Sequence, residues 1–246
     1  MGPREFYETL PSTQDRALEL ARSGAPEGTR VVARRQTRGR GRLDRSWESP
    51  EGGLYCSVVV ARPRRHPGLL PLTAGALLAS EFREAYTVPV ALKWPNDLLV
   101  VEPGRPPRKL SGILVDDVAS ARLGRAAVVG VGVNVRLDPG AVAPSLSLRV
   151  AALAEFASMP PEVEEVEAMV VRSVLDAAER LGDDDGARDA RALCRTLLYG
   201  VGRPVTVDGA AAGTIESIGE EGELWLRTPA ERVAIWAGDV RVEETA

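Results

Sequence analysis

The sequence has 246 residues, of which 44% are hydrophobic and 27% are charged, and its formal net charge is -4. This composition is typical of a folded globular protein with room for one large and one small domain, and it excludes disordered, collagen-like and disulfide-stapled chains. The N-terminal segment lacks the basic and apolar regions of a secretory signal, and no apolar run is long enough to cross a membrane, so we expect a cytoplasmic protein without membrane contact.

The first half of the chain predicts helices and strands without regular alternation. Ser12 or Thr13 is a suitable N-cap for a helix that Gly24 ends. Pro95 cannot donate a hydrogen bond within a sheet, so the β-region around it must break there. In chain order we predict strands at 30–33, 54–61, 90–93, 97–101, 110–115 and 126–135, and a helix at 71–86.

The second half predicts three helices followed by short strands. We expect the helices at 148–156, 161–181 and 189–198, and after Tyr199 the sequence changes to short β-runs separated by turn residues. Short strands of this kind are typical of a small closed β-barrel. The predicted fold class is therefore α+β, with a mixed β-sheet covered by helices on one face in residues 1–198 and the barrel in residues 199–246.

Cysteine and histidine give no indication of catalysis. Cys56 and Cys194 are far apart and fit no metal-binding spacing, so we expect two buried thiols rather than a disulfide or a zinc site. His66 is the one histidine of the chain, and its loop-like surroundings argue against a Ser-His-Asp triad.

Residue types that the chain otherwise avoids are more informative. Of 31 basic residues only two are lysines, and the chain has two asparagines and two glutamines. Lysine offers a compact ammonium group, and a side-chain amide offers a donor and an acceptor together, neither of which arginine supplies. We therefore interpret these six residues as candidates for a functional site: Lys93, Lys109, Asn96, Asn134, Gln14 and Gln36.

A glycine- and arginine-rich segment predicts a loop that binds an anion. Residues 34–45 contain six arginines and one acidic residue, although the net charge of the chain argues against nucleic-acid binding by the protein as a whole. Gly39 and Gly41 let the backbone approach a ligand, and the guanidinium groups match phosphate oxygens. A polyphosphate or acyl phosphate would suit the loop. A solvated basic loop and an RNA-binding tract are the alternatives.

The segment from Lys93 to Asp97, KWPND, presents an ammonium, an amide and a carboxylate at the strand break. Asp97 could hold a metal-bound nucleotide, and Lys109 begins the strand across the hairpin. Two converging cations are costly without an anion between them, which favours an anion site. The alternative is a structural kink with a Lys–Asp ion pair.

Five ordered motifs between residues 10 and 150 resemble biotin protein ligases. They are STQD (12–15), GRGRLDRSW (39–47), KWPNDLLV (93–100), RKLSGILVD (108–116) and GVGVNV (130–135). The C-terminal part resembles the SH3-like barrel of that family. The resemblance implies a ligase that uses biotin and MgATP to form biotinyl-5′-AMP and then transfers biotin to a lysine of a biotin carboxyl carrier protein, part of acetyl-CoA carboxylase or a related carboxylase.

The resemblance also implies roles for individual residues. Lys109, Arg40 and Arg42 would be catalytic, at the junction of the biotin carboxylate and the α-phosphate. Asp97 would hold Mg²⁺. The residues implied for biotin are Ser12, Thr13, Gln14, Gln36, Gly39, Arg40, Gly41, Arg42, Lys109 and Gly112. Those implied for the nucleotide are Arg42, Arg45, Trp47, Lys93, Asn96 and Asn134. We expect the loop at residues 37–48 to be mobile without ligand, and Trp47 to close over the base.

The sequence departs from the family pattern in three places. Gln14 stands where asparagine is common, and Leu43 and Asp44 stand where basic or small residues are expected. Only eleven residues precede Ser12, too few for the DNA-binding domain of some members, so we expect neither DNA binding nor repressor function. A homodimer is among the assemblies that the sequence permits. Lipoate ligase, which shares the catalytic fold, and a non-catalytic nucleic-acid binder are the competing hypotheses.

Overall fold

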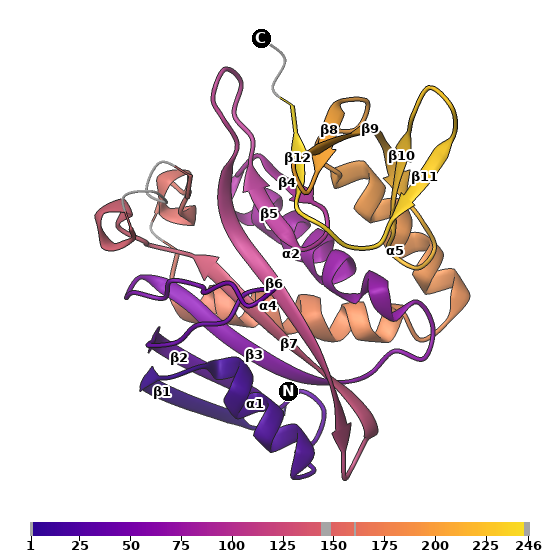
Figure 1. The fold of residues 1–246 in the computed structure, drawn as a ribbon. Helices are drawn as coiled ribbons and strands as arrows, with labels where there is room; N and C mark the ends of the chain where they lie inside the picture. The colour runs from indigo at the N-terminus through magenta and orange to yellow at the C-terminus, as the bar shows by residue number, and fades with distance from the viewer. Residues whose placement is uncertain (1, 144–148, 160, 244–246) are drawn as a thin grey trace.

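The computed structural model describes residues 2–143, 149–159 and 161–243. Its larger part is a seven-stranded mixed sheet in which only the β1–β2 pair is parallel (Figure 1). In spatial order the strands are β1 (Arg4–Leu10), β2 (Arg30–Gln36), β3 (Gly53–Ala61), β7 (Gly124–Asn134), β6 (Arg108–Ser120), β5 (Asp97–Val100) and β4 (Val90–Lys93).

Helices cover both faces of this sheet, because alternate residues of its central strands are apolar on both sides. On β3, Val58 and Val60 face the main core under α2 (Leu70–Tyr86) and α4 (Val163–Arg180). Val59 faces a smaller core under α1 (Thr13–Arg22). The α+β class and the mixed sheet are confirmed. The expectation that helices lie on one face holds for α2, α4 and α5 (Asp184–Leu197), whereas α1 packs on the opposite face.

Two local predictions hold for clear chemical reasons. Ser12 is the N-cap of α1, and its Oγ accepts a hydrogen bond from the backbone N–H of Asp15 at 3.3 Å. The β-region around Pro95 is broken into β4 and β5, which form an antiparallel hairpin with Lys93 opposite Asp97. The turn between them therefore projects its side chains from the end of the sheet.

One strand was not predicted, and two predicted helices differ from the structure. The edge strand β1 was not predicted; it is held by Arg4, which with Arg30 of β2 binds the Glu167 carboxylate of α4. The predicted helix at 148–156 is wrong: residues 149–156 contain only one 3₁₀ turn, Leu153–Glu155, and residue 148 lies outside the described residues. Helix α5 begins at Asp184, five residues early, because Asp183 caps it by accepting from the N–H of Gly186.

The C-terminal part, for which the short β-runs predicted a small closed β-barrel, is a five-stranded antiparallel sheet. Its spatial order leaves β11 and β12 as its two ends, and its buried side chains, such as Ile215, Leu224 and Val240, join the main core of the large sheet. Among the described residues no helix is long and apolar enough to pass through a bilayer. The strands are β8 (Pro204–Val207), β9 (Ala210–Ile218), β10 (Leu224–Arg227), β11 (Arg232–Ile235) and β12 (Val240–Val242).

Candidate functional site

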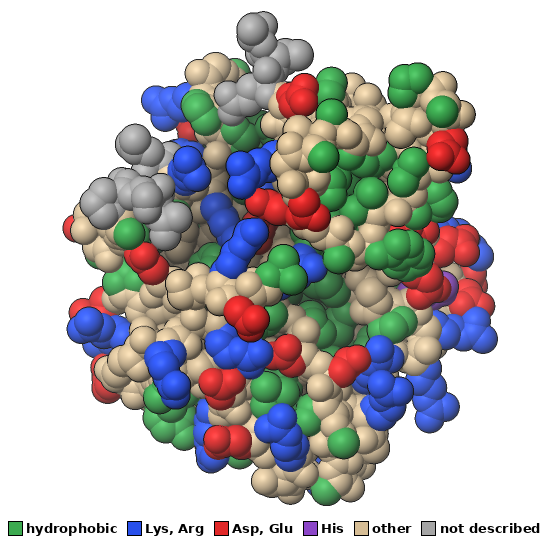
Figure 2. All heavy atoms as spheres, viewed as in Figure 1, with side chains coloured by type: hydrophobic (Ala, Val, Ile, Leu, Met, Phe, Trp, Pro, Cys, Tyr) green, Lys and Arg blue, Asp and Glu red, His purple; other side chains and the backbone are tan. Residues whose placement is uncertain are grey.

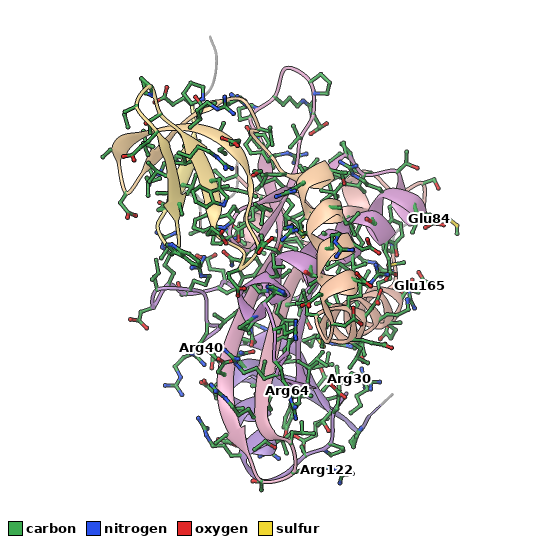
Figure 3. The ribbon with its side chains drawn as sticks, turned by 90° about the vertical axis from the view of Figure 1, so that its right-hand side faces the viewer. Arg30, Arg40, Arg64, Glu84, Arg122 and Glu165 are labelled. Atoms are coloured by element: carbon green, nitrogen blue, oxygen red, sulfur yellow. The ribbon has the colours of Figure 1, made fainter. Side chains whose placement is uncertain are left out.

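A cavity opens on the α1 face of the large sheet, beside α1 and under the C-terminal sheet. Figure 2 shows a hollow near the centre of this face with basic and acidic side chains around it. Including its open mouth, the empty space is about 1020 Å³, which is at the upper end of the range for small-molecule sites. Arg40 lies on this side of the sheet, whereas Glu84 of α2 and Glu165 of α4 lie on the other (Figure 3).

The floor of the cavity is made of glycines on neighbouring strands. A Cβ on Gly112 of β6 would come within 2.8 Å of the Trp47 ring, and one on Gly132 of β7 within 2.6 Å. A Cβ on Gly130 would come within 2.5 Å of the Gln14 amide oxygen. The absence of side chains at these positions therefore lets flat groups lie directly on the sheet. In this structure the Trp47 indole lies there, and its buried Nε1 has no hydrogen-bond partner among the described residues.

The arginine-rich loop folds as a tight hairpin over the cavity. The Gly41 N–H donates to the Arg45 carbonyl at 2.7 Å, and the Arg45 N–H donates back to Arg42 at 3.2 Å. Leu43 and Asp44 both have positive φ, 53° and 56°, as a type I′ turn requires. This conformation favours glycine or asparagine at both positions. The departure of Leu43–Asp44 from the family pattern thus falls on the two strained residues of the turn.

Cations and carboxylates gather at the end of the cavity nearest the C-terminal sheet. Lys109 Nζ lies 2.8 Å from Asp97 Oδ1 and 5.0 Å from the centroid of the Trp47 ring. Arg42 Nη1 donates to Asn96 Oδ1 at 3.2 Å, and burial lowers the Arg42 pKa without removing its charge at neutral pH. Two separate segments of the sequence therefore place Arg42 and Lys109 in one cavity wall.

The C-terminal sheet adds a carboxylate to this cluster. Asp239, just before β12, lies 3.6 Å from Arg45 Nη2 and 3.1 Å from Arg241 Nη2. Desolvation raises the pKa of Asp239, but Arg241, Lys93 and Arg45 together lower it below its ordinary value. The cavity is therefore lined at this end by a residue that lies outside every motif of the sequence.

At the opposite end, four side chains form a continuous chain of polar contacts. Gln14 Oε1 accepts from Ser57 Oγ at 3.0 Å, Ser57 Oγ contacts Thr13 Oγ1 at 2.9 Å, and Thr13 Oγ1 lies 3.1 Å from Gln36 Oε1. The Thr13 backbone N–H also donates to Gln36 Oε1 at 2.8 Å. We call Gln14, Ser57, Thr13 and Gln36 the polar chain. Three of its members are buried, and Gln36 is half-buried in the cavity wall.

The Arg40 guanidinium forms ion pairs with two carboxylates and does not point at the glycine floor of the cavity. Its Nη1 lies 2.9 Å from Asp15 Oδ1 and 3.1 Å from Asp116 Oδ2. Asp116 Oδ2 also accepts from Gln14 Nε2 at 3.2 Å. Arg40 therefore has less positive charge to offer a ligand than Arg42 or Lys109.

Thirteen of the sixteen residues predicted for the site line this one cavity. The other three are close to it: Thr13 lies behind Gln36, Gly39 is packed against the backbone of Trp47, and Asn134 donates to the Lys109 carbonyl at 3.2 Å. The residues that line the cavity are Ser12, Gln14, Gln36, Arg40, Gly41, Arg42, Arg45, Trp47, Lys93, Asn96, Asp97, Lys109 and Gly112.

Sequence reasoning missed several residues of the site. Gly130 and Gly132 had a signal, since alternate glycines in a strand indicate a close approach of another group. Asp116 ends a quoted motif, but nothing in the sequence pairs it with Arg40. Ser57 lies in the middle of an apolar strand, and Asp239 lies in the C-terminal sheet; no local pattern distinguishes either of them.

The arrangement suits a ligand that is neutral at one end and anionic at the other. The polar chain and the glycine floor can take a flat ring, and the cationic cluster can take phosphates. In the described part of the chain, no three His, Cys, Asp or Glu residues are grouped to hold a metal ion by themselves. Asp97 is a single carboxylate in the cavity wall, which fits Mg²⁺ bound largely by phosphates and water.

The chain is similar in sequence and in fold to known proteins. The model of the biotin/lipoate A/B protein ligase family matches residues 6–134. Over 247 residues the chain is 31% identical to the bifunctional ligase/repressor BirA of Bacillus subtilis, covering 96% of this chain and 73% of that protein. It is 33% identical to the biotin–[acetyl-CoA-carboxylase] ligase of Mycobacterium tuberculosis, covering 93% and 85%. The fold is similar to that of the Aquifex aeolicus biotin protein ligase solved with biotin and ATP, with a TM-score of 0.82 and 25% identity over both full chains.

Proposed function

The chain belongs to the biotin/lipoate A/B protein ligase family, and within this family we propose that it is a biotin protein ligase. The biotin carboxylate attacks the α-phosphorus of ATP, the bond to pyrophosphate breaks, and biotinyl-5′-AMP forms. A lysine amine of a carrier protein then attacks the acyl carbon, AMP leaves, and an amide forms with loss of a proton. One observation carries this proposal: a single cavity is lined by the two glutamines of the polar chain, by the glycine floor and by the Arg42–Lys109 pair.

For biotin, the neutral ring end fits the polar chain. Gln36 and Thr13 offer polar atoms there, and Ser12 lines the same wall. The apolar valeryl chain fits the floor at Gly112 and Gly132, where the Trp47 ring now lies. The carboxylate would then approach the cationic end of the cavity.

We assign the junction of carboxylate and α-phosphate to Arg42 and Lys109. Both cations line the cavity and lie on separate segments, so they can hold the attacking oxygen and the phosphate together as charge develops. The backbone around Gly39 and Gly41 can approach the same oxygens. Arg40 is less suited to contact the carboxylate or the α-phosphate directly, because its guanidinium is bound by Asp15 and Asp116.

For the nucleotide, Arg45, Lys93 and Asn96 surround the phosphate end of the cavity, and Asn134 supports the Lys109 backbone. Trp47 would stack on the base after leaving the glycine floor, and this closure would keep water from the adenylate. Mg²⁺ would be held by Asp97 together with phosphate oxygens, and it would neutralise charge on the leaving pyrophosphate.

The carrier is the biotin carboxyl carrier protein of acetyl-CoA carboxylase or a related carboxylase. We also propose residues 1–198 as the catalytic domain and residues 199–246 as a C-terminal domain that helps to close the nucleotide end through Asp239. A cytoplasmic location is proposed because the reaction consumes ATP. A homodimer is the assembly to test.

The proposed function is tested by incubating the full chain with MgATP, biotin and a carrier domain. Intact mass spectrometry should show a carrier that has gained one biotinyl group, and a carrier with arginine in place of the acceptor lysine should show none. An unmodified carrier after incubation with biotin, together with one modified by lipoate, would replace this proposal by the lipoate ligase hypothesis.

A further inference from the structure

Two large apolar side chains are exposed where the cavity opens to the surface. Leu43 is 66% exposed and lines the cavity, and Trp236 is 65% exposed and lines a groove beside it. Only five large hydrophobic side chains are exposed in the described part of the chain, so two of the five are found at this site. A single exposed apolar side chain is ordinary, whereas several at one place on the surface indicate a contact with another molecule.

The groove meets the cavity at its reactive end. With its open mouth the groove holds about 950 Å³, and it shares with the cavity the hydrogen-bonded pair Arg42 and Asn96. Leu43 and Trp236 therefore each border a hollow that is lined by Arg42, the cation that we place at the reacting carboxylate. A carrier lysine has to reach the acyl carbon at that point, so the turn that presents the lysine must come to rest at this opening.

Leu43 has an unfavourable backbone conformation as well as an unfavourable exposure. Its φ of 53° lies in the left-handed region, which is costly for a residue with a Cβ and free of strain for glycine. Its side chain belongs to none of the buried apolar clusters of the described residues. An exposed and strained residue that does not stabilise the fold points to a role in function.

The Asp44 carboxylate is exposed, and no cation or hydrogen-bond donor is paired with it within the described residues. The nearby arginines of the loop are bound elsewhere: Arg42 donates to Asn96 at 3.2 Å, and Arg45 Nη2 lies 3.6 Å from Asp239. The charge of Asp44 is therefore open to a cation that comes from outside. The acceptor lysine of a carrier arrives as an ammonium group, and a carboxylate at this opening attracts it.

We propose that Leu43, Asp44 and Trp236 form the surface on which the carrier protein docks. Apolar side chains of the carrier cover Leu43 and Trp236, and Asp44 draws the acceptor lysine to the opening. The inference rests on the proposed function for the identity of the partner. Because biotin and ATP are taken up inside the cavity, this surface serves only the second step, in which the lysine amine attacks the acyl carbon and AMP leaves.

The test separates carrier docking from the chemistry. Adenylate formation is measured as biotin-dependent pyrophosphate release without carrier, and acyl transfer without docking is measured as biotinyl hydroxamate formed from hydroxylamine. Transfer to the carrier domain is followed by intact mass spectrometry. Leu43→Gly, Asp44→Asn and Trp236→Ala should each lower kcat/KM for the carrier by about 10-fold and keep the other two rates within about twofold of wild type.

The dependence on salt distinguishes the charged contact from the apolar ones. Salt screens exposed charges, so the deficit of Asp44→Asn with the carrier should shrink as the ionic strength rises to about 1 M. The deficits of Leu43→Gly and Trp236→Ala should persist. Glycine and asparagine both suit a left-handed φ, so the two loop substitutions preserve the turn.

Two matched variants serve as controls. Leu43→Met keeps an apolar side chain at the same backbone position and should retain the wild-type rate with the carrier. Glu84→Gln removes an exposed carboxylate on α2, on the opposite side of the sheet, and should change none of the three rates (Figure 3).

An unchanged kcat/KM for the carrier in all three variants overturns the inference. Equal losses with carrier and with hydroxylamine also overturn it, because the residues would then act on the chemistry rather than on docking. A dimer that these variants dissociate while carrier transfer stays normal would assign the surface to a second copy of the chain instead. A wild type that releases no pyrophosphate with biotin defeats the proposed function.

Discussion

The Lys109 ammonium lies 2.8 Å from the Asp97 carboxylate, and this ion pair faces the cavity rather than the core. The two residues come from β5 and β6, and Lys109 also lies over the Trp47 ring. A cation held between a carboxylate and an aromatic face is in place before any substrate arrives. Nucleotide phosphates would compete with Asp97 for the same ammonium.

Lys109→Ala should reduce biotinyl-adenylate formation by about 10²–10³-fold, the effect typical of removing one donor from a developing anion. Lys109→Arg should restore little, because a planar guanidinium cannot replace a point charge at this position. The rate is measured as biotin-dependent pyrophosphate release. Arg122→Ala, an exposed substitution in the β6–β7 turn, is the control and should keep full activity. Equal rates in Lys109→Ala and Arg122→Ala would remove Lys109 from the reaction.

Because the Trp47 ring lies on the glycine floor, the effects of Gly132→Ala and Trp47→Ala on the free energy of unfolding should not be additive. Gly132→Ala places a Cβ 2.6 Å from the Trp47 ring, so it should destabilise the ligand-free protein by about 1–3 kcal/mol. The same substitution in a Trp47→Ala background should cost much less, because the clashing ring is gone. Urea unfolding of the four proteins gives the coupling free energy. Additive effects would show that Trp47 does not lie on Gly132 in solution.

The parts of the fold with strong periodicity could be predicted from the sequence, as could the place of most site residues along the chain. Strand β3 is apolar along nearly its whole length, and α4 has a wide apolar face. Strand β1 was missed because it is an edge strand with a mostly exposed sequence, and a distant carboxylate, Glu167, holds it. The apolar pattern at 148–156 resembles a helix, but in the described part of this segment Ala151, Ala152 and Leu153 are buried by tertiary packing around a single 3₁₀ turn.

In the site, too, the sequence predicted individual residues but not the contacts between distant segments. Rare residue types identified Lys109, Gln14 and Gln36 because the chain uses lysine and glutamine almost nowhere else. Nothing local indicates that Ser57 joins Thr13 to Gln14, or that Asp116 binds Arg40. Those contacts are set by the register of β3, β6 and β7, which depends on the whole sheet.

Glu167 should make the stability of the protein depend on pH in the acid range. Desolvation raises its pKa, but the hydrogen bonds from Arg4 and Arg30 lower it below the ordinary value of 4.5. A carboxyl whose folded pKa is depressed adds stability that is present above the unfolded pKa and is lost as pH falls through the folded pKa. The unfolding free energy should therefore fall below about pH 4.5 more steeply than in Glu167→Gln.

The Glu167→Gln variant should itself be less stable at pH 7 by about 1–3 kcal/mol, because two arginines lose a charged partner. Glu165→Gln, an exposed substitution two residues earlier on α4, is the control and should leave the fall of the unfolding free energy at acid pH unchanged. Urea unfolding at a series of pH values measures both. If the unfolding free energies of wild type and Glu167→Gln fell equally steeply below about pH 4.5, Glu167 would not be the source of the acid dependence.

The arginine-rich loop should change its protection when ligands bind. Amides of residues 37–48 are expected to exchange fast without ligand and to become protected with biotin and a nonhydrolysable ATP analogue, as Trp47 leaves the floor and the hairpin closes. Hydrogen exchange followed by mass spectrometry measures this, with the central strand β7 as the internal control. Equal protection of the loop in both states would show that it does not act as a lid.

In the proposed reaction one cavity joins an organic acid to the α-phosphate of ATP, and the acid is biotin. The most direct measurement is transfer of label from α-³²P-ATP to an acyl adenylate, with biotin, lipoate and octanoate supplied separately to the full chain and its Lys109→Ala variant. We expect labelled biotinyl-5′-AMP from the wild type, little or none from the variant, and little from the other two acids. Label in lipoyl- or octanoyl-adenylate instead, or none with any acid, would contradict it.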